Sequence, residues 1–532
     1  MYRFTKITSY EYNQHKTLEL RSILNNQSSR PSTFVASEFY SSVDSLKILG
    51  NMEATLIQNY RQYLKLQKRD IDNVQRFIKE VKFHHELAKE DVADYIGNPT
   101  NAFTLIKRMV SDWKELFEFL KFRDVKTDIE ESLTQFENDF QLPDEGELKG
   151  AIRGLRRLQS IYKLNAEDMA RGDKYGTSLN WRDCFEIGTT LLDDTSFKLA
   201  IDWLELSLLT LQDSEESIEM KSAYIAHIKE YLAFAYQGIG ESDIAIEHLD
   251  DILENDADAS VKLTRNLLLN SETDINEHNE KSIDNNYARL CRGEILRKLQ
   301  PLSCKLDSKL HAFFKLSPLQ VEPLLLKPPV TLYHNLLNDE QISKLLKETR
   351  NRMQRSQVVR GNGSIAIETR VSQQTWVNPK TSVIANMMYK IVGAITGFDM
   401  ENTETMQVAN YGIGGQYEAH CDYLEIYNFY YLFKLDYKTN YHGDRIATNM
   451  FYLADVEEGG HTVFPYLDVY SKPIKGAMVM WYNLHKSLHE DPRTLHAGCP
   501  VLKGSKKIAN IWTHSGYQEF RRPCGLENDS HE

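Results

Sequence analysis

The chain has 532 residues, of which 41% are hydrophobic and 11% are aromatic, so it is long enough to bury the cores of several domains. Its formal net charge of -13 argues against nucleic acid as a partner, because the phosphate backbone repels an acidic protein. No stretch reaches the length of a membrane-spanning helix, and six cysteines are too few for a small fold held together by disulfides. We therefore expect a multidomain globular protein.

The N-terminal third is predicted to be helical after a polar start. Residues 1–37 lack the apolar core of a secretory signal, and we expect this segment to be disordered. From residue 38 to about residue 85, apolar side chains recur at three- and four-residue steps, and further helical stretches lie near 101–121 and 147–164, so residues 38–165 are predicted to form a helical, coiled-coil-like domain. The recurring residues include Leu56, Tyr60, Tyr63, Ile71, Val74, Phe77, Ile78 and Val81.

Residues 166–270 contain an internal repeat. The sequence Ala200-Ile-Asp-Trp-Leu-Glu205 recurs as Ala245-Ile-Glu-His-Leu-Asp250, each within an amphipathic helix that follows another helix. This pattern predicts tetratricopeptide-like helix pairs, which stack to form a groove. Residues 271–290 are rich in Ser, Asn, Asp and Glu, so we expect a polar linker there.

The segment 291–525 has shorter apolar runs and Gly/Pro turns, which predict a β-rich domain followed by a short tail, 526–532. One helix is signalled by Asn338-Asp339 ahead of Ile342 and Leu345, because an asparagine can cap a helix N-terminus. The tail carries no endoplasmic reticulum retrieval signal.

His420-Cys421-Asp422 is the most informative chemical motif. A histidine and an aspartate two positions apart on a strand point to the same side, and a distal histidine completes three ligands that leave positions open on ferrous iron. His485, His489 and His496 are all available, but only His496 is followed ten residues later by a cation, Lys506. A basic residue there can pair with the far carboxylate of an acidic cosubstrate such as 2-oxoglutarate. The motif predicts an iron oxygenase.

Three neighbouring features refine this prediction. Lys506 and His514 are an even number of residues apart, so on an unbroken strand their side chains lie on the same face and point toward one cavity. A second His-x-Asp motif, His442-Gly443-Asp444, follows a polar stretch and contains a glycine, which is more typical of a turn than of a metal site. Cys421 should point away from the two ligands that flank it.

Five segments carry the remaining motifs of the C-terminal half. They are Gln407–Asp422, Arg445–Thr448, Gly459–Pro465, Trp481–Leu484 and the run from His496 to Cys524. Together they resemble the catalytic domain of collagen prolyl 4-hydroxylase alpha subunits, and weaker similarity extends back to about Glu38. The resemblance implies an α+β multidomain protein in which helical N-terminal and tetratricopeptide-like domains precede a double-stranded β-helix, or jelly-roll, catalytic domain.

The same resemblance implies roles for the residues above. Three residues would bind Fe(II): His420, Asp422 and His496. Lys506 would bind the distal carboxylate of 2-oxoglutarate, and His514 would assist at its metal-chelating end. Tyr411 is a further candidate for contact with the cosubstrate, although a packed strand tyrosine is an equally good interpretation. The implied reaction uses O2, with L-ascorbate as a further cofactor, and hydroxylates the 4-carbon of a peptidyl proline as 2-oxoglutarate becomes succinate and CO2.

Assembly and location are also implied by the resemblance. The N-terminal helices would associate alpha subunits within an α2β2 heterotetramer, with protein disulfide isomerase as the beta subunit, in the endoplasmic reticulum lumen. Amphipathic helices packed within one chain would give the same sequence pattern, so both interpretations stay open. The glycosylation candidates in such a lumen are Asn26, Asn362 and Asn528.

Two disulfides are implied in the same way. Cys291 would pair with Cys304, and Cys499 would pair with Cys524, which suits an oxidising compartment. The other two cysteines, Cys184 and Cys421, would stay outside these bonds.

The predicted groove departs from the family pattern. In the family, tyrosines of this module stack on the rings of an extended proline-rich peptide. Here Tyr231 is kept and Phe234 keeps only a ring, whereas Leu192, Gln237 and Leu269 stand where tyrosines are usual. Tyr231 and Phe234 are candidate peptide contacts, although packing of the repeat core explains them equally well. The same iron chemistry on a non-collagen peptide, or a noncatalytic peptide-binding subunit, therefore remains an alternative.

Overall fold

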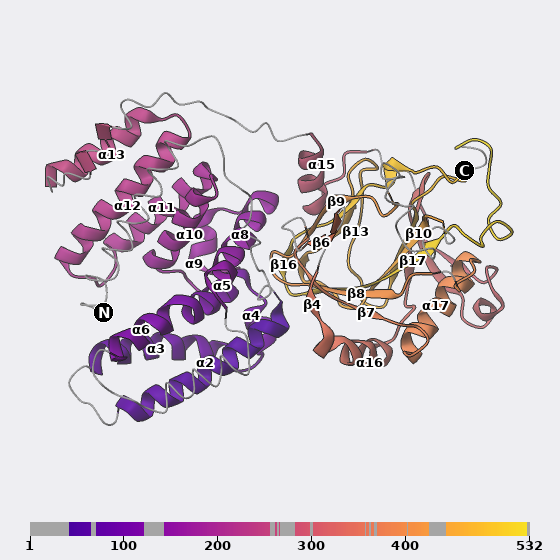
Figure 1. Cartoon of the computed structure of the whole chain (residues 1–532), viewed down its shortest axis with the longest axis horizontal. Helices are drawn as coiled ribbons and strands as arrows, with labels where there is room; N and C mark the ends of the chain where they lie inside the picture. Colours follow the sequence, from indigo (N-terminus) through magenta and orange to yellow (C-terminus); the bar gives the residue numbers. More distant parts are fainter. Residues whose placement is uncertain are drawn as a thin grey trace. The chain divides into compact units, whose positions relative to one another are not determined.

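The structure is a computed structural model that describes residues 42–64, 71–121, 143–255, 261–262, 265–266, 282–297, 302–356, 358–360, 363–365, 370–401, 403–424 and 443–528. The chain divides into two compact units, residues 1–279 and 280–532, of which the first is helical and the second contains the sheets (Figure 1). Several predictions fall outside the described residues: the segment 1–37, the sequons at Asn26 and Asn362, Leu269 and His442. Every helix in the described part of the chain is too short or too polar to span a lipid bilayer.

The first part of the helical unit buries its apolar stripe within the chain. Its helices are α2 (Val43–Leu64), α3 (Ile71–Leu87), α4 (Val92–Ile96), α5 (Pro99–Lys107), a π-helical turn (Arg108–Asp112), α6 (Trp113–Lys121) and α8 (Glu145–Tyr162). Five of the recurring apolar residues named above are at most 8% exposed: Leu56, Val74, Phe77, Ile78 and Val81. Phe77 packs edge-on against Trp113, with ring centroids 4.9 Å apart. This burial favours packing within one chain, and self-association through these helices stays a prediction.

The second part of the helical unit contains the repeat, in α9 (Ala166–Arg171), α10 (Trp181–Asp193), α11 (Phe197–Gln212), α12 (Ile218–Gly238) and α13 (Ser242–Asn255). Ala200 and Ala245 occupy equivalent positions of α11 and α13, and both are fully buried. Gly188 allows α10 to approach α11 closely, because a Cβ atom there would lie 2.7 Å from the side chain of Leu204. The repeated sequence therefore corresponds to two helix pairs, α10 with α11 and α12 with α13.

Buried polar contacts join the two parts of the helical unit. Lys107 of α5 forms an ion pair with Asp183 of α10 at 2.7 Å, and Trp203 of α11 donates a hydrogen bond to Gln159 of α8 at 2.9 Å. Breaking such a buried ion pair leaves an uncompensated charge, so it resists separation of the helices that it joins. The predicted domain boundary at residue 165 lies between these partners and stays a prediction.

The second unit is built on antiparallel sheets. The largest has nine strands in the order β1 (Lys305–Asp307), β2 (Leu319–Leu326), β3 (Pro329–His334), β14 (Met478–Tyr482), β10 (Arg445–Tyr452), β17 (Lys506–His514), β8 (Met406–Tyr411), β7 (Gln373–Val377) and β4 (Gln354–Arg355). A four-stranded sheet has the order β13 (Val469–Ser471), β12 (Thr462–Phe464), β15 (His496–Gly498) and β9 (Tyr417–His420). Two short pairs join β11 (Glu458–Gly459) to β16 (Val501–Lys503), and β5 (Val358–Arg360) to β6 (Gly363–Ile365).

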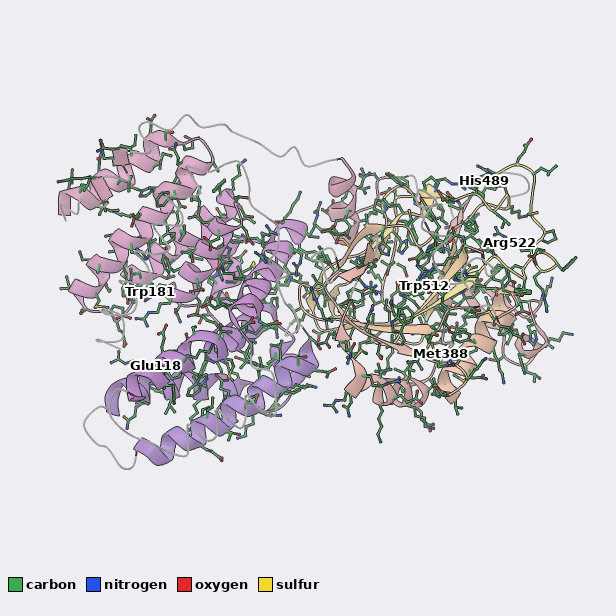
Figure 2. All side chains as sticks on the ribbon, in the orientation of Figure 1. Glu118, Trp181, Met388, His489, Trp512 and Arg522 are labelled. Carbon is green, nitrogen blue, oxygen red and sulfur yellow. A yellow bond between two sulfur atoms is a disulfide. The ribbon has the colours of Figure 1, made fainter. Side chains whose placement is uncertain are left out.

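Apolar side chains on each face of the nine-stranded sheet contribute to a separate apolar core. One core lies under α16 (Asp339–Thr349) and α17 (Val383–Thr396) and includes Met388, which Figure 2 labels. The other core combines Tyr452 and Ile508 of this sheet with Phe464 of the four-stranded sheet. The predicted cap of α16 is present, because the Asn338 side chain accepts a hydrogen bond from the Gln341 backbone N–H at 2.9 Å. Strands β8, β10 and β17 are thus buried on both faces, and polar side chains between the two sheets lie in the interior of the unit.

The prediction that the linker extends to residue 290 is wrong. Residues Ser282–Cys291 form helix α15, which packs against β12 and β13. The Tyr287 hydroxyl donates to Gln416 at 3.2 Å, and Arg289 forms an ion pair with Asp468. The polar composition of this segment suggested a linker, but Tyr287, Leu290 and Cys291 of α15 are buried.

The predicted disulfide pairing is also wrong. Cys291 is bonded to Cys499, 208 residues away in the sequence, with their Cα atoms 5.5 Å apart. Cys304 and Cys524, the predicted partners, are exposed thiols. Packing of α15 on the four-stranded sheet brings Cys291 to the residue that follows β15, and no local sequence spacing could indicate this contact.

Candidate active site

The structure brings the three predicted metal ligands together. His420 ends β9 and His496 begins β15, and the two are directly opposite in the antiparallel pair, which places both rings on one face. Asp422 lies just beyond the end of β9, with its Oδ1 3.7 Å from His420 Nε2 and its Oδ2 3.5 Å from His496 Nε2. One ligand atom from each residue lies within 4.8 Å of the others. This arrangement matches the two histidines and one carboxylate that bind ferrous iron in oxygenases.

The competing histidines lie elsewhere. His485 is buried beside Asp491, at 3.7 Å, and His489 is exposed on a surface loop (Figure 2). Asp444 of the second His-x-Asp motif accepts hydrogen bonds from two backbone N–H groups, as expected of a turn residue, while its His442 lies outside the described residues. Among the described residues, only the predicted triad forms a cluster able to hold a metal ion.

Asp422 is held in place by the nine-stranded sheet. Thr448 Oγ1 and Trp512 Nε1 both donate to Asp422 Oδ2, at 2.7 and 2.9 Å, and Asn483 in turn donates to Thr448 at 2.9 Å. Thr448 and Trp512 are paired in register between β10 and β17. These donors saturate one carboxylate oxygen, whereas no donor in the described part of the chain bonds to Oδ1, which leaves that oxygen for a metal ion.

Burial and hydrogen bonding prepare each ligand for metal binding. Burial lowers the pKa of His420 and His496, so both imidazoles are neutral near pH 7. Burial alone would raise the pKa of Asp422, but its coupling to His496 and His420, the charge of Arg445 and the hydrogen bond from Trp512 together hold that pKa below its usual range, so the carboxyl is ionised. The Nδ1 atoms of His420 and His496 face the backbone carbonyls of Glu418, at 2.7 Å, and Thr494, at 3.1 Å. These carbonyls place the proton on Nδ1 and leave Nε2 as the metal-binding atom.

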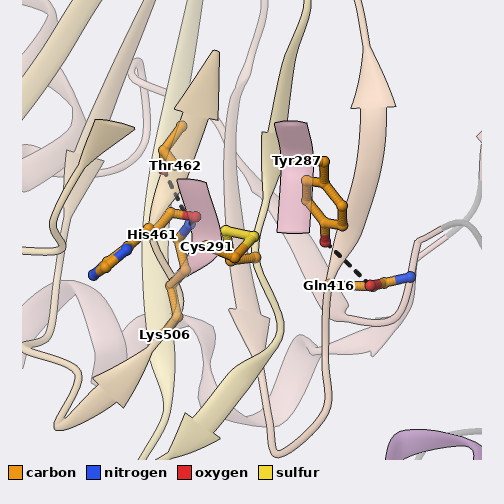
Figure 3. Close-up of a disulfide and its surroundings, with 7 residues drawn as sticks. Tyr287, Cys291, Gln416, His461, Thr462 and Lys506 are labelled. Carbon is orange, nitrogen blue, oxygen red and sulfur yellow. Dashed lines mark hydrogen bonds between the residues drawn. A yellow bond between two sulfur atoms is a disulfide. The ribbon is translucent and has the colours of Figure 1, made fainter. Parts of the chain in front are cut away.

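Lys506 provides a buried cation near the triad. Its side chain is almost inaccessible, and its Nζ donates to Thr462 Oγ1 at 3.0 Å and approaches the His461 carbonyl oxygen at 3.5 Å (Figure 3). A Cβ atom on Gly498, two residues after His496, would lie 3.7 Å from this Nζ. Among the described residues no carboxylate pairs with Lys506, and burial lowers its pKa to about 7. A buried ammonium with only neutral partners favours an anionic ligand.

Comparisons with known proteins agree with this geometry. The family described as "Prolyl 4-Hydroxylase alpha-subunit, N-terminal region" matches residues 42–176, and the family described as "2OG-Fe(II) oxygenase superfamily" matches residues 406–514, which include the triad. Prolyl 4-hydroxylase subunit alpha-3 of Mus musculus is 32% identical over 89% of this chain and 91% of its own length. Subunit alpha-1 of Gallus gallus is 31% identical over 92% of this chain and 99% of its own length.

The chain belongs to the prolyl 4-hydroxylase alpha-subunit family. A solved structure of a viral collagen prolyl hydroxylase from Paramecium Bursaria Chlorella virus-1, in complex with 2-oxoglutarate, is 28% identical over 34% of this chain and 94% of the viral chain, with a TM-score of 0.28.

The other two predicted cosubstrate residues occupy different settings. Tyr411 is paired with Lys506 between β8 and β17, and Lys506 Nζ lies 5.8 Å from its ring centroid. His514 shares a strand face with Lys506, but its Nδ1 lies 2.7 Å from the Gly443 carbonyl and its Nε2 lies 2.9 Å from Glu404 Oε1. Both nitrogens of His514 therefore have protein partners, and its contact with the cosubstrate stays a prediction.

Glu404 lies in no motif of the sequence, and Arg445 stands out there only as part of the segment Arg445–Thr448. Burial alone would raise the pKa of Glu404, but the hydrogen bond with His514 and the charge of Arg445 lower it to about 2. The Arg445 guanidinium forms an ion pair with Glu404, lies 4.3 Å from the Trp512 ring centroid and donates to the Asp422 backbone carbonyl at 3.3 Å. Arg445 thus links His514 to the metal ligand Asp422. The parity shared by Lys506, Trp512 and His514 was the sequence signal that could have placed Trp512 in the site.

Proposed function

We propose that this chain is the catalytic subunit of a collagen-type prolyl 4-hydroxylase, which uses Fe(II), O2 and 2-oxoglutarate to hydroxylate peptidyl proline at C4. The convergence of His420, Asp422 and His496 beside the buried cation Lys506 carries this proposal. Membership of the prolyl 4-hydroxylase alpha-subunit family supports proline as the target. An intact ligand set disfavours a noncatalytic peptide-binding subunit, because such a subunit has no use for open metal positions.

Different residues of the site would bind the iron, bind the cosubstrate and orient the metal ligands. When iron is bound by the triad, it supplies the activation of O2 and the chelation of the 2-oxo acid end of the cosubstrate. Lys506 and Thr462 would hold the distal carboxylate, because an ammonium and a hydroxyl can both donate to it. Thr448 and Trp512 keep Asp422 aimed at the metal position. The apolar core that includes Tyr452 and Phe464 lies beside Thr462 and would keep water away from Lys506.

We extend the proposal to the architecture of each unit. The nine-stranded and four-stranded sheets would form a double-stranded β-helix, since they enclose a common apolar core between them. Helices α10 to α13 would form tetratricopeptide-like pairs that bind the peptide, which is supported by the equivalent buried positions of Ala200 and Ala245. Within this module, Tyr231 and Phe234 are only 3% and 6% exposed, and Tyr231 packs edge-on against Phe185. Their burial favours packing of the repeat core over direct stacking on a proline ring.

Assembly and location complete the proposal. We propose that protein disulfide isomerase is the beta subunit of an α2β2 heterotetramer, that L-ascorbate sustains activity, and that the complex works in the endoplasmic reticulum lumen. The Cys291–Cys499 disulfide supports an oxidising compartment. Asn528, the sequon residue that the structure describes, is exposed, as a glycosylation acceptor must be.

The decisive test combines two assays on the full chain with Fe(II), ascorbate and 2-oxoglutarate. Succinate release and 4-hydroxyproline would both be measured with a (Pro-Pro-Gly) repeat peptide and with a matched peptide in which alanine replaces the hydroxylated proline. We expect hydroxyproline and succinate in equal amounts with the first peptide and neither above background with the second. Succinate release that neither peptide stimulates would favour a non-collagen target, and the absence of any turnover would favour a noncatalytic subunit.

A further inference from the structure

The Cys291–Cys499 disulfide lies next to the buried cation of the site. Cys499 directly follows β15, three residues after the ligand His496, and its backbone N–H donates to the His461 carbonyl oxygen at 2.8 Å. Lys506 Nζ approaches that same oxygen at 3.5 Å (Figure 3). One carbonyl oxygen is therefore shared between the backbone of a bonded cysteine and the cation predicted to bind 2-oxoglutarate.

Helix α15 and the turn that follows it pack beside the His461 carbonyl. The His461 ring stacks on Tyr470, with centroids 4.9 Å apart and planes 14° from parallel. The turn that follows α15 covers this stack, because a Cβ atom on Gly293 would lie 3.5 Å from the Tyr470 hydroxyl oxygen. Cys291 and Cys499 are each only 1% exposed. The disulfide thus fastens the end of α15 to the strand connection behind Lys506.

Helix α15 also has anchors that do not depend on the disulfide. Within the helix, Tyr287 donates to Gln416 at 3.2 Å and Arg289 forms an ion pair with Asp468. Six residues after the helix ends, the backbone N–H of Arg297 donates to the same carboxylate at 2.6 Å. With these contacts in place, loss of the disulfide should leave α15 docked and release chiefly the backbone around Cys499. The effect on the site can then be separated from unfolding.

We propose that the Cys291–Cys499 disulfide is a positioning element for the cosubstrate, which fixes the His461 carbonyl and thereby the orientation of Lys506. This inference rests on the proposed binding of 2-oxoglutarate by Lys506. The Lys506 ammonium donates one hydrogen bond to the Thr462 hydroxyl and a second to the His461 carbonyl. Together these two acceptors hold the lysine side chain in one rotamer before the cosubstrate arrives. Without the disulfide, Cys499 and the carbonyl bound to it can shift, and affinity for 2-oxoglutarate falls while the iron ligands keep their own hydrogen bonds.

The pairing itself is tested first on the unreduced full chain. After alkylation of exposed thiols and protease digestion, mass spectrometry should find the peptide containing Cys291 joined to the peptide containing Cys499. Cys304 and Cys524 should both carry the alkyl group, because both are exposed thiols. Finding Cys291 joined to Cys304, or Cys499 joined to Cys524, would overturn the inference.

The positioning role is tested with two matched double variants. Cys291→Ser with Cys499→Ser should raise the KM for 2-oxoglutarate about five-fold, the equivalent of one lost hydrogen bond, with the KM for iron unchanged. Cys304→Ser with Cys524→Ser removes the same number of thiols away from the site and should leave both constants at the wild-type values. A purely structural role would instead lower kcat, iron affinity and the melting temperature together.

Reduction of the folded wild-type chain covers the case in which the serine variant does not fold. A dithiol donates two electrons and two protons to the S–S bond, becomes a cyclic disulfide, and leaves thiols on Cys291 and Cys499. After removal of the reductant under nitrogen, 2-oxoglutarate binding should weaken about five-fold, as in the variant, and reoxidation should restore it. An unchanged affinity after confirmed reduction would overturn the inference.

Lys506→Ala separates this inference from the proposed function. If Lys506→Ala raises the KM for 2-oxoglutarate and loss of the disulfide does not, the positioning role alone fails. If neither change affects that constant, the assignment of Lys506 to the cosubstrate fails as well.

Discussion

The two ends of the proposed cosubstrate cavity are prepared in opposite ways. At the metal end, the charge of Asp422 is matched by two hydrogen-bond donors and by the neighbouring Arg445, and each histidine has a backbone partner. At the other end, Lys506 is equally buried, but its partners among the described residues are all neutral: the Thr462 hydroxyl, the His461 carbonyl, and the rings of Tyr411 and Tyr452. The three iron ligands are in place before iron arrives, whereas no carboxylate in the described part of the chain pairs with Lys506. Substitutions at the two ends should therefore change different constants.

The largest effect is expected at the metal end. His496→Ala removes one of three iron ligands, and we expect turnover to fall by at least about a thousand-fold, because each ligand of a catalytic metal contributes several kcal/mol. Succinate release and iron content per chain would be measured together. His489→Ala, which changes an exposed histidine on a surface loop, is the matched control and should keep both values. Full activity of His496→Ala would contradict the assigned ligand set.

The lysine end should affect cosubstrate use rather than iron. Lys506→Ala removes the proposed charge partner of the distal carboxylate, and we expect the KM for 2-oxoglutarate to rise about 10- to 100-fold, as for a lost charge-assisted hydrogen bond. The adjacent Lys507 points to the other face of β17, so Lys507→Ala is the control. Kinetics at saturating iron would decide the outcome, and equal constants in the two variants would refute the role of Lys506.

A conservative change behind Asp422 should weaken iron binding without removing a ligand. Thr448→Val keeps the shape of the side chain and deletes the hydroxyl that donates to Asp422, and we expect iron affinity to fall about 10- to 100-fold. Thr331→Val, at a half-buried position of β3, is the control. Equilibrium titration with Fe(II) under nitrogen measures both variants, and wild-type affinity in Thr448→Val would show that Asp422 needs no such support.

Over a single pH unit, the smallest effect expected is on pH dependence, and it concerns the lysine end alone. Burial lowers the pKa of Lys506 from 10.5 to about 7, so without a ligand the amine becomes neutral as the pH rises above that value. Binding of a dianion favours the charged form and must then take up a proton. The KM for 2-oxoglutarate should rise by up to about ten-fold per pH unit above pH 7 and should be flat below it.

Lys506→Arg is the control for this pH dependence, because arginine keeps its charge at every pH of interest. Its KM for 2-oxoglutarate is expected to be higher than that of the wild type at pH 7 but nearly constant up to pH 9. A wild-type constant that does not change between pH 7 and pH 9 would contradict the description of Lys506 as a buried amine without a counter-charge.

The contrast between local and long-range contacts explains how much the sequence could predict. The pair His420 and Asp422, and the interval from His496 to Lys506, are short-range patterns, and the structure brings all four residues to one region. Asp422 was predicted to lie beside His420 because residues two apart on a strand point to the same side. The two side chains do lie together, but Asp422 is beyond the end of β9. It is held by side chains from β10 and β17, whose register is set by pairing between strands that are distant in sequence.

Other outcomes depended on tertiary contacts that no local pattern encodes. Cys291 meets Cys499 only because α15 packs on the four-stranded sheet. Tyr231 is buried because α10 presents Phe185 to it, whereas its helix alone could equally have turned it toward a groove. The apolar stripe of α2 and α3 was predicted correctly as helical, but its burial depends on packing partners such as Trp113.

Anaerobic titration of the full chain with Fe(II) and 2-oxoglutarate measures whether the histidine–aspartate triad and Lys506 bind the metal and the cosubstrate together. Chelation of ferrous iron by a 2-oxo acid produces a visible charge-transfer absorption, which reports on both ends of the cavity in one experiment. We predict one saturating transition for the wild type, a transition shifted to higher 2-oxoglutarate concentration for Lys506→Ala, and no absorption for His496→Ala. Identical titration curves for all three proteins would contradict the account.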